Sequence, residues 1–348
     1  MKISVKVRRQ ASRTSVPTYQ TYEVQADPHS NTVLDILHKI QWEQDGSLVF
    51  RRNCRNVICG SCGLRINGRS GLACQKLVSE FFGEELLEQT SVGGTHPARN
   101  REPEFVPELL VEPMQNLPVI KDLVVDMTKF WQNLSKVDPF VSTASRQISK
   151  TEFLQTPAER DKLQAAANCI LCGSCYSECN AAAVNDRFVG PHALAKAYRV
   201  MADNRDDRTT ERIAQYNQSN FVWDCTRCYN CNEVCPVEVQ PLDRISQVKQ
   251  AILADANLPE STPQLHRHTM VELVKQDGWI DESKFGIKVV GNNFKNLKGI
   301  ASLIPVGFRM VLKGKMPYPW QFKPSEGIKE IKSLMTAVLN RRSKLKSK

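Results

Sequence analysis

The sequence predicts an α+β protein built from a small strand-rich domain, a helical domain and a basic C-terminal extension. Residues 1–9 and 18–25 alternate apolar and polar side chains, a pattern typical of strands with one buried face. From about residue 119 onward the apolar side chains recur at helical spacing instead. The chain has 348 residues and twelve cysteines, and the cysteines fall into three groups of four. A chain of this length accommodates two or three domains.

Composition excludes several classes of protein. A hydrophobic content of 41% argues against a disordered chain, and the length is ample for a buried core without disulfides. The longest apolar stretch, residues 299–312, contains Pro305 and Arg309 and is shorter than the ~20 residues of a membrane-spanning helix. The first residues, MKISVKVRRQASRT, lack the apolar core of a secretory signal, so we expect neither export nor disulfides.

The positive charge is concentrated at the C-terminal end. Residues 284–348 hold 15 Lys and Arg and only two acids, a net charge of +13. The remaining 283 residues hold 32 bases and 35 acids, a net charge of −3. The basic tail predicts either a solvated surface or attachment to anionic lipid or an acidic partner. A nearly neutral body disfavours nucleic acid as a partner.

The first cysteine group has the spacing C-x4-C-x2-C, followed by a fourth cysteine after eleven residues. Its members are Cys54, Cys59, Cys62 and Cys74. This is the spacing of plant-type [2Fe–2S] ferredoxins. Gly60 and Gly63 predict a loop whose backbone wraps closely and turns N–H groups toward sulfur. The alternative is a zinc site, although zinc sites usually pair two short C-x2–4-C hairpins, which this stretch lacks.

The second and third cysteine groups share the spacing C-x2-C-x2-C-x3-C of two-cluster bacterial ferredoxins. In that motif the fourth cysteine of each run ligates the cluster of the other run. One predicted [4Fe–4S] cluster therefore takes Cys169, Cys172, Cys175 and Cys235. The other takes Cys179, Cys225, Cys228 and Cys231. Pro236 follows the last cysteine as the motif expects, whereas Asn180 stands where the other proline would be.

The cysteine loops divide the chain into domains. Thr32 and Asp35 predict a capped helix over residues 32–44, and the order strand, strand, helix, cluster loop predicts a β-grasp ferredoxin domain over residues 1–110. Five prolines between residues 97 and 118 predict an extended connection.

Helix signals flank the other two groups. Thr156 and Glu159 form a capping box before one helix, Pro191 begins another, and residues 242–254 form a third. These predict an α-helical ferredoxin domain with two clusters over residues 111–255, and residues 256–348 form the extension. In the extension, helical spacing from Phe294 is expected to end at Pro305 and to resume over residues 328–339.

No motif for bond-breaking chemistry is visible. The sequence has no P-loop and no G-x-G-x-x-G fingerprint, and its six histidines do not cluster with the cysteines. We therefore expect no catalytic residue on this chain and interpret it as an electron carrier.

With these motifs, residues 1–250 resemble the iron–sulfur subunit of succinate dehydrogenase and fumarate reductase. The resemblance includes all three cysteine groups, VEPMQNLPVIKDLVVDM at 111–127 and the GPHALAKAYR stretch that begins at residue 190. It implies an electron path from an FAD-containing flavoprotein that oxidises succinate, through [2Fe–2S] and [4Fe–4S], to a third centre. That centre is usually [3Fe–4S] and reduces quinone at a membrane anchor. The resemblance also implies a peripheral position on the cytoplasmic side of a prokaryotic membrane, with no transmembrane helix of its own.

The sequence departs from the family pattern at the third centre. The family usually has three cysteines there and another residue at position 228, whereas Cys228 supplies a fourth thiolate. We therefore predict a second [4Fe–4S] cluster, with [3Fe–4S] as the alternative. The tryptophan and histidine expected near the quinone are replaced by Ala183 or Val184 and by Thr226.

These departures resemble a non-classical form of the complex, whose anchor is similar to a cysteine-rich subunit of heterodisulfide reductase. The leading hypothesis is a subunit of succinate:quinone oxidoreductase. One alternative is a fumarate reductase subunit that draws electrons from a thiol or another soluble donor. The remote alternative is a cluster-bearing regulator that binds nucleic acid through its basic tail.

Overall fold

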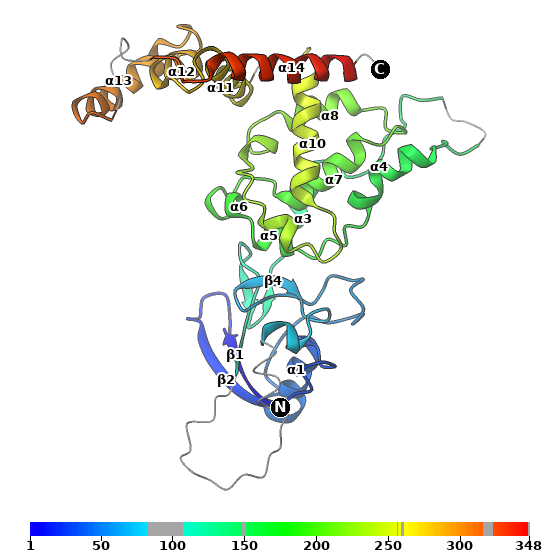
Figure 1. Ribbon diagram of the computed structural model, residues 1–348. Coiled ribbons are helices and arrows are strands. Elements are labelled where there is room, and N and C mark those ends of the chain that lie inside the picture. The colour runs from blue at the N-terminus through cyan, green and yellow to red at the C-terminus, as the bar shows by residue number, and fades with distance from the viewer. Residues whose placement is uncertain (83–106, 148–150, 256, 259–260, 316–322, 347–348) are drawn as a thin grey trace. The chain divides into compact units, whose positions relative to one another are not determined.

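The computed structural model describes residues 1–82, 107–147, 151–255, 257–258, 261–315 and 323–346. The chain forms two compact units, Met1–Ala254 and Asp255–Lys348, which are described separately (Figure 1). Of the extended connection predicted for residues 97–118, residues 97–106 lie outside the described residues.

The first unit begins with a five-stranded mixed sheet of order β2-β1-β5-β3-β4. The strands are β1 (Lys2–Arg9), β2 (Thr18–Gln25), β3 (Gly63–Ile66), β4 (Arg69–Leu72) and β5 (Glu108–Glu112). β1 pairs antiparallel with β2, with Val5 opposite Tyr22, and parallel with β5. The predicted strands at 1–9 and 18–25 are thus confirmed, because the inward side chains of their alternating pattern, such as Ile3 and Val24, are buried.

One helix packs into the core of this sheet. α1 (Val33–Lys39) continues as a π-helical turn over Ile40–Gln44, which confirms the predicted helix over residues 32–44. Its capping box is present, because the Thr32 hydroxyl accepts from Asp35 N at 3.2 Å and Asp35 accepts from Thr32 N at 3.0 Å. Leu34 and Ile36 of α1 are fully buried in the core cluster that β1 and β5 also line. The result is the predicted β-grasp arrangement, with the first cysteine loop between α1 and β3.

The predicted domain boundary at residue 110 lies inside β5, the strand that joins the two halves of the sheet. The two-stranded ribbon that follows, β6 (Val119–Lys121) and β7 (Val124–Val125), is also attached to the sheet domain. The buried Asp122 carboxylate accepts hydrogen bonds from Gln10 N at 3.0 Å and Val49 N at 3.1 Å. Asp122 lies beyond residue 110 and is bonded to residues of the sheet domain, so the sheet domain includes this ribbon.

Short helices surround the other cysteine groups. They are α3 (Thr128–Ser135), α4 (Pro157–Ala167), α5 (Ser174–Ser177), α6 (Asn180–Val184), α7 (Pro191–Met201), α8 (Thr209–Tyr216), α9 (Asn230–Glu233) and α10 (Pro241–Ala254). The capping box that begins α4 and the proline that begins α7 are as predicted. α7 and α10 pack against each other (Figure 1). The apolar face of α7, which includes Leu194 and Ala197, is completely buried.

The second unit consists of α11 (Thr262–Asp277), α12 (Glu282–Val289), α13 (Leu297–Leu312) and α14 (Ile328–Lys346). The expectation that Pro305 ends a helix is wrong, since α13 continues for seven residues beyond it. Proline deprives the Ala301 carbonyl of its helical donor. Ala301 is exposed, so water can bond that carbonyl and the helix tolerates the loss. Within the described ranges, no helix is both long enough and apolar enough to span a membrane.

Candidate metal centres

The first cysteine loop is shaped by residues with positive φ. Arg55 and Val57 have φ of 57° and Gly60 has φ of 68°, which curls the backbone around the sulfur of Cys54. Asn56 N and Cys59 N each lie 3.3 Å from that sulfur as donors. The predicted N–H groups facing sulfur therefore exist, but non-glycine residues supply them. Gly63 has no positive φ and instead allows close approach of other residues.

In this loop, hydrogen bonding lowers the pKa of one thiol and burial raises the pKa of another. Burial alone would raise the pKa of Cys59, but hydrogen bonds from Ser61 and Cys54 bring it down to about 6. The Ser61 hydroxyl lies 3.0 Å from the Cys59 sulfur. Burial raises the pKa of Cys62 to about 12. Of these two thiols, Cys59 is the more readily ionised, whereas Cys62 would release a proton on binding a metal.

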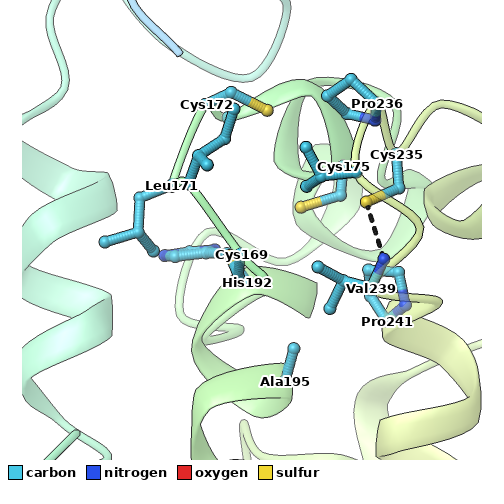
Figure 2. Close-up of a pocket in the computed structure, with 13 residues that line it drawn as sticks. Cys169, Leu171, Cys172, Cys175, His192, Ala195, Cys235, Pro236, Val239 and Pro241 are labelled. Carbon is cyan, nitrogen blue, oxygen red and sulfur yellow. Dashed lines mark hydrogen bonds between the residues drawn. The ribbon is translucent and has the colours of Figure 1, made fainter. Parts of the chain in front are cut away.

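Four cysteines from two different runs meet around one cavity (Figure 2). They are Cys169, Cys172, Cys175 and Cys235. The remaining wall is nearly all apolar and includes Leu171 and Val239. Val239 N donates to the Cys235 sulfur at 3.3 Å (Figure 2). Thiols without competing carboxylates favour an iron–sulfur cluster or zinc over hard cations.

A second cavity is lined by the other four cysteines of the helical region. They are Cys179, Cys225, Cys228 and Cys231. Its other walls include Phe188, Leu242 and Ile245. Each cavity thus receives three cysteines from one run and the fourth from the other. Among the described residues, no three His, Cys, Asp or Glu side chains converge on a single point as ligands of one metal ion do.

Burial makes most of these thiols poor acids in the absence of metal. It raises the pKa of Cys172 and Cys175, that of Cys179 to about 11, and that of Cys231 to about 12. Metal binding must displace these protons, so loading of both cavities is coupled to proton release. Cys228 differs from the other eleven cysteines because its side chain is exposed.

The two helical cysteine runs have the same backbone geometry. Leu171 and Arg227, between the first and second cysteines, have φ of 56° and 59°. Gly173 and Tyr229, after the second cysteine, have φ of 88° and 74°. Lys196 of α7 and Lys249 of α10 each donate to the carbonyl of the first cysteine of a run, at 3.2 Å. This repetition explains why equal spacing in sequence produces two similar cysteine-lined cavities.

The first loop lies directly against the second. A Cβ at Gly60 would lie 2.9 Å from Cα and Cβ of Cys172, and one at Gly63 would lie 3.1 Å from the Cys172 carbonyl. Both glycines are therefore needed for close approach. Asn116 stabilises the second cysteine run. Its side-chain amide donates to the carbonyls of Tyr176, Ser177 and Cys179 at 2.9–3.1 Å. The spacing of the cysteines gave no indication of this role for Asn116.

Comparison with known proteins agrees with this geometry. Residues 4–132 match the model of a 2Fe-2S iron–sulfur cluster binding domain, and residues 165–239 match that of a 4Fe-4S dicluster domain. The fumarate reductase iron–sulfur subunit of Haemophilus influenzae is 32% identical over 246 residues, which cover 67% of this chain and 86% of the relative. The subunit of the same name from Escherichia coli O6:H1 is 34% identical over 249 residues, covering 72% and 91%.

This chain belongs to the fumarate reductase and succinate dehydrogenase iron–sulfur subunit family. A chain of the Mycobacterium smegmatis Sdh1 complex in the apo form has the same fold, with a TM-score of 0.59 and 24% identity over 75% of this chain and 99% of that one. The predicted α+β fold is confirmed. As a family member, the chain is an electron-transfer subunit of an oxidoreductase complex that carries 2Fe-2S and 4Fe-4S clusters. The family includes both succinate dehydrogenases and fumarate reductases, so membership leaves the direction of the reaction open.

Proposed function

We propose that this subunit transfers electrons between an FAD-containing flavoprotein and a quinone or an anchor subunit in a succinate:quinone oxidoreductase. One observation carries this proposal: the first cysteine loop contacts the second, and the second and third runs exchange their fourth cysteines. The three groups therefore form a continuous series within one compact unit. The clusters, when bound, accept and release single electrons.

We assign one cluster to each cysteine set. Cys54, Cys59, Cys62 and Cys74 hold [2Fe–2S], and Cys169, Cys172, Cys175 and Cys235 hold the first [4Fe–4S]. Cys179, Cys225, Cys228 and Cys231 hold the third cluster. The protein's own contribution is to fix the thiols, to donate N–H groups to their sulfurs and to keep water out with apolar walls. Anaerobically purified protein should contain about ten irons, and stoichiometric zinc would contradict the assignment.

Cys228 makes the third cluster [4Fe–4S] rather than [3Fe–4S] in this proposal. Its sulfur lines the same cavity as the other three thiols, which supports a ligand for a fourth iron. In EPR spectra of the anaerobic, oxidised protein we expect no [3Fe–4S] signal, and Cys228→Ser should produce one. Thr226→Ser, on the same cavity wall, is the matched control and should produce none. A strong signal in anaerobic wild-type protein would favour the three-iron alternative.

The subunit works, in this proposal, as a peripheral protein on the cytoplasmic side of a prokaryotic membrane. The residues expected at the usual quinone pocket are absent, and Val184 at that position has 86% of its surface exposed. Cys228, which lines the third cavity, is also exposed. This exposure would let a protein acceptor approach the third cluster, such as a cysteine-rich anchor similar to that of heterodisulfide reductase.

A fumarate reductase that takes electrons from a thiol is the second candidate, and the same replaced residues favour it. The assembled complex should be assayed with succinate plus a quinone analogue, and with a dithiol plus fumarate. Faster quinone reduction would support the first candidate, and faster fumarate reduction the second.

A further inference from the structure

Helix α13 presents three distinct faces. One face packs inside the second unit: Leu303 lies against Gly286 of α12, where an added Cβ would meet its Cδ1 at 3.0 Å, and Ile300 lies against Gly291. The second face is apolar and has the spacing i, i+4, i+7, i+11, i+15. Its members are Leu297, Ala301, Ile304, Phe308 and Leu312. The third face carries Lys298, Arg309 and Lys313.

The apolar face has no partner among the described residues that buries it. Leu297 has 71% of its surface exposed, Ile304 and Phe308 65% each, and Leu312 69%. No residue of α13 is buried. Four large side chains exposed to this extent along a single line mark an interaction surface rather than the scattered apolar residues of an ordinary surface.

The segment that carries this face is strongly basic. Residues 283–325 contain eight Lys and Arg and no Asp or Glu. Two of these cations, Lys284 and Lys288, pair with acids of other segments. The three cations of α13 lie on the flank of the apolar face, where they would stand at the level of lipid headgroups if that face entered a membrane. An apolar stripe with cations on its flank, and with no acid on the helix itself, is complementary to an anionic bilayer surface.

We propose that α13 lies in the membrane interface, with its apolar face among the acyl chains and its cations on anionic headgroups. The helix is too short to span the bilayer, so it lies along the surface. This inference rests on the peripheral location proposed above. It assigns that location to the iron–sulfur subunit itself, independently of any anchor subunit.

Vesicle flotation tests the proposal with the full chain alone. Wild-type protein should float with vesicles of equal parts phosphatidylcholine and phosphatidylglycerol, and much less with phosphatidylcholine alone. Phe308→Asp should weaken binding roughly tenfold or more, because it places a charge in the inserted face. Lys298→Gln and Lys313→Gln should each weaken it roughly fivefold, as expected for one cation at an anionic surface.

Leu334→Asp is the matched control, because Leu334 of α14 is 67% exposed and carries the same chemistry on another helix. It should bind vesicles like wild type. Equal loss in both aspartate variants, or no flotation of the wild type, would overturn the proposal. The proposal would also be overturned if the protein were recovered with membranes only when an anchor protein is present. A dimer of the wild type that Phe308→Asp disrupts would overturn it as well.

Electron transfer from succinate to a soluble dye in the assembled complex should be unchanged by Phe308→Asp. In the wild type, absence of dye reduction would contradict the proposed function, whereas absence of flotation would contradict the lipid-binding role of α13. A loss of dye reduction in this variant would mean that the substitution disturbs the fold, and flotation of Lys298→Gln and Lys313→Gln then decides the proposal.

Discussion

His192 is a buried, titratable residue at the centre of the helical region. Its ring stacks on Phe130 with centroids 3.7 Å apart, and its Nε2 lies 3.0 Å from the Phe130 carbonyl. Only 1% of its surface is exposed. Burial lowers the pKa of His192 from the ordinary 6.5 to about 4. Between about pH 4 and pH 6.5, His192 therefore carries a proton in the unfolded chain but not in the folded chain.

This difference makes folding of the first unit weaken as the pH falls from about 6.5 to about 4. His192→Gln keeps a donor for the Phe130 carbonyl but cannot titrate. We expect the stability advantage of wild type over His192→Gln to shrink by about 2 kcal/mol between about pH 7.5 and pH 5. Denaturant unfolding at both pH values measures it.

Phe130→Leu is the control, since it removes the stacking but leaves the titrating group. Its deficit relative to wild type should change less with pH than that of His192→Gln. A constant deficit for His192→Gln would show that this histidine does not couple folding to pH.

At the scale of single residues, the sequence predicts the cysteine ligands better than it predicts the residues that hold them in place. Equal spacing in two runs was enough to assign Cys235 and Cys179 to opposite cavities, because the local backbone geometry repeats. Asn116 could not be predicted, since it is 60 residues from the Tyr176 carbonyl that it bonds. Cys228 was recognised as an extra thiol, but its exposure depends on tertiary packing.

At the scale of elements, the buried Arg212 of α8 pairs with Asp206 and also joins α8 to the segment after α3. Arg212 is 1% exposed and donates to both Asp206 oxygens at 3.0 Å. It also donates to the carbonyls of Asp138 at 2.8 Å and Phe140 at 2.7 Å. The pair therefore fixes residues 138–140 against the helix as well as neutralising its own charges.

Arg212→Met should destabilise the first unit by about 3–5 kcal/mol, because it leaves the Asp206 carboxylate buried without its cation. Adding Asp206→Leu should recover part of that loss, since the isolated charge is then removed. Thermal or denaturant unfolding of both variants measures the effect. Arg208→Gln, at an exposed pair with Glu211, is the matched control and should change little. An equal effect at both arginines would contradict the role of burial.

Helix starts were predictable and one helix end was not. Capping boxes and N-terminal prolines act locally, so Thr156 and Pro191 mark helix starts without reference to the rest of the fold. Whether Pro305 ends a helix depends on the exposure of the carbonyl that it leaves unbonded and on the packing of Leu303 against α12. Neither can be read from local sequence.

At the scale of the whole first unit, we expect electron transfer to depend on how closely the first two cysteine loops approach. The sheet domain and the helical region are held together by polar contacts, including Ser70 Oγ to Ser177 Oγ at 2.7 Å and Ser70 N to Glu178 Oε1 at 3.0 Å. These contacts bring Gly60 against Cys172. The sequence predicted both loops but gave no indication that they touch.

Gly60→Ala should separate these loops. The new Cβ would lie 2.9 Å from backbone and side-chain carbons of Cys172, and the positive φ of 68° adds strain. Gly68→Ala is a matched control, because Gly68 has φ of 80° but nothing within 4 Å of an added Cβ. Both variants should lose about 1 kcal/mol of stability from backbone strain. Only Gly60→Ala should lose more, and only it should slow reduction of the [4Fe–4S] clusters by succinate in the assembled complex. Freeze-quench EPR measures that rate, and equal rates in the two variants would show that close contact of the loops does not limit electron transfer.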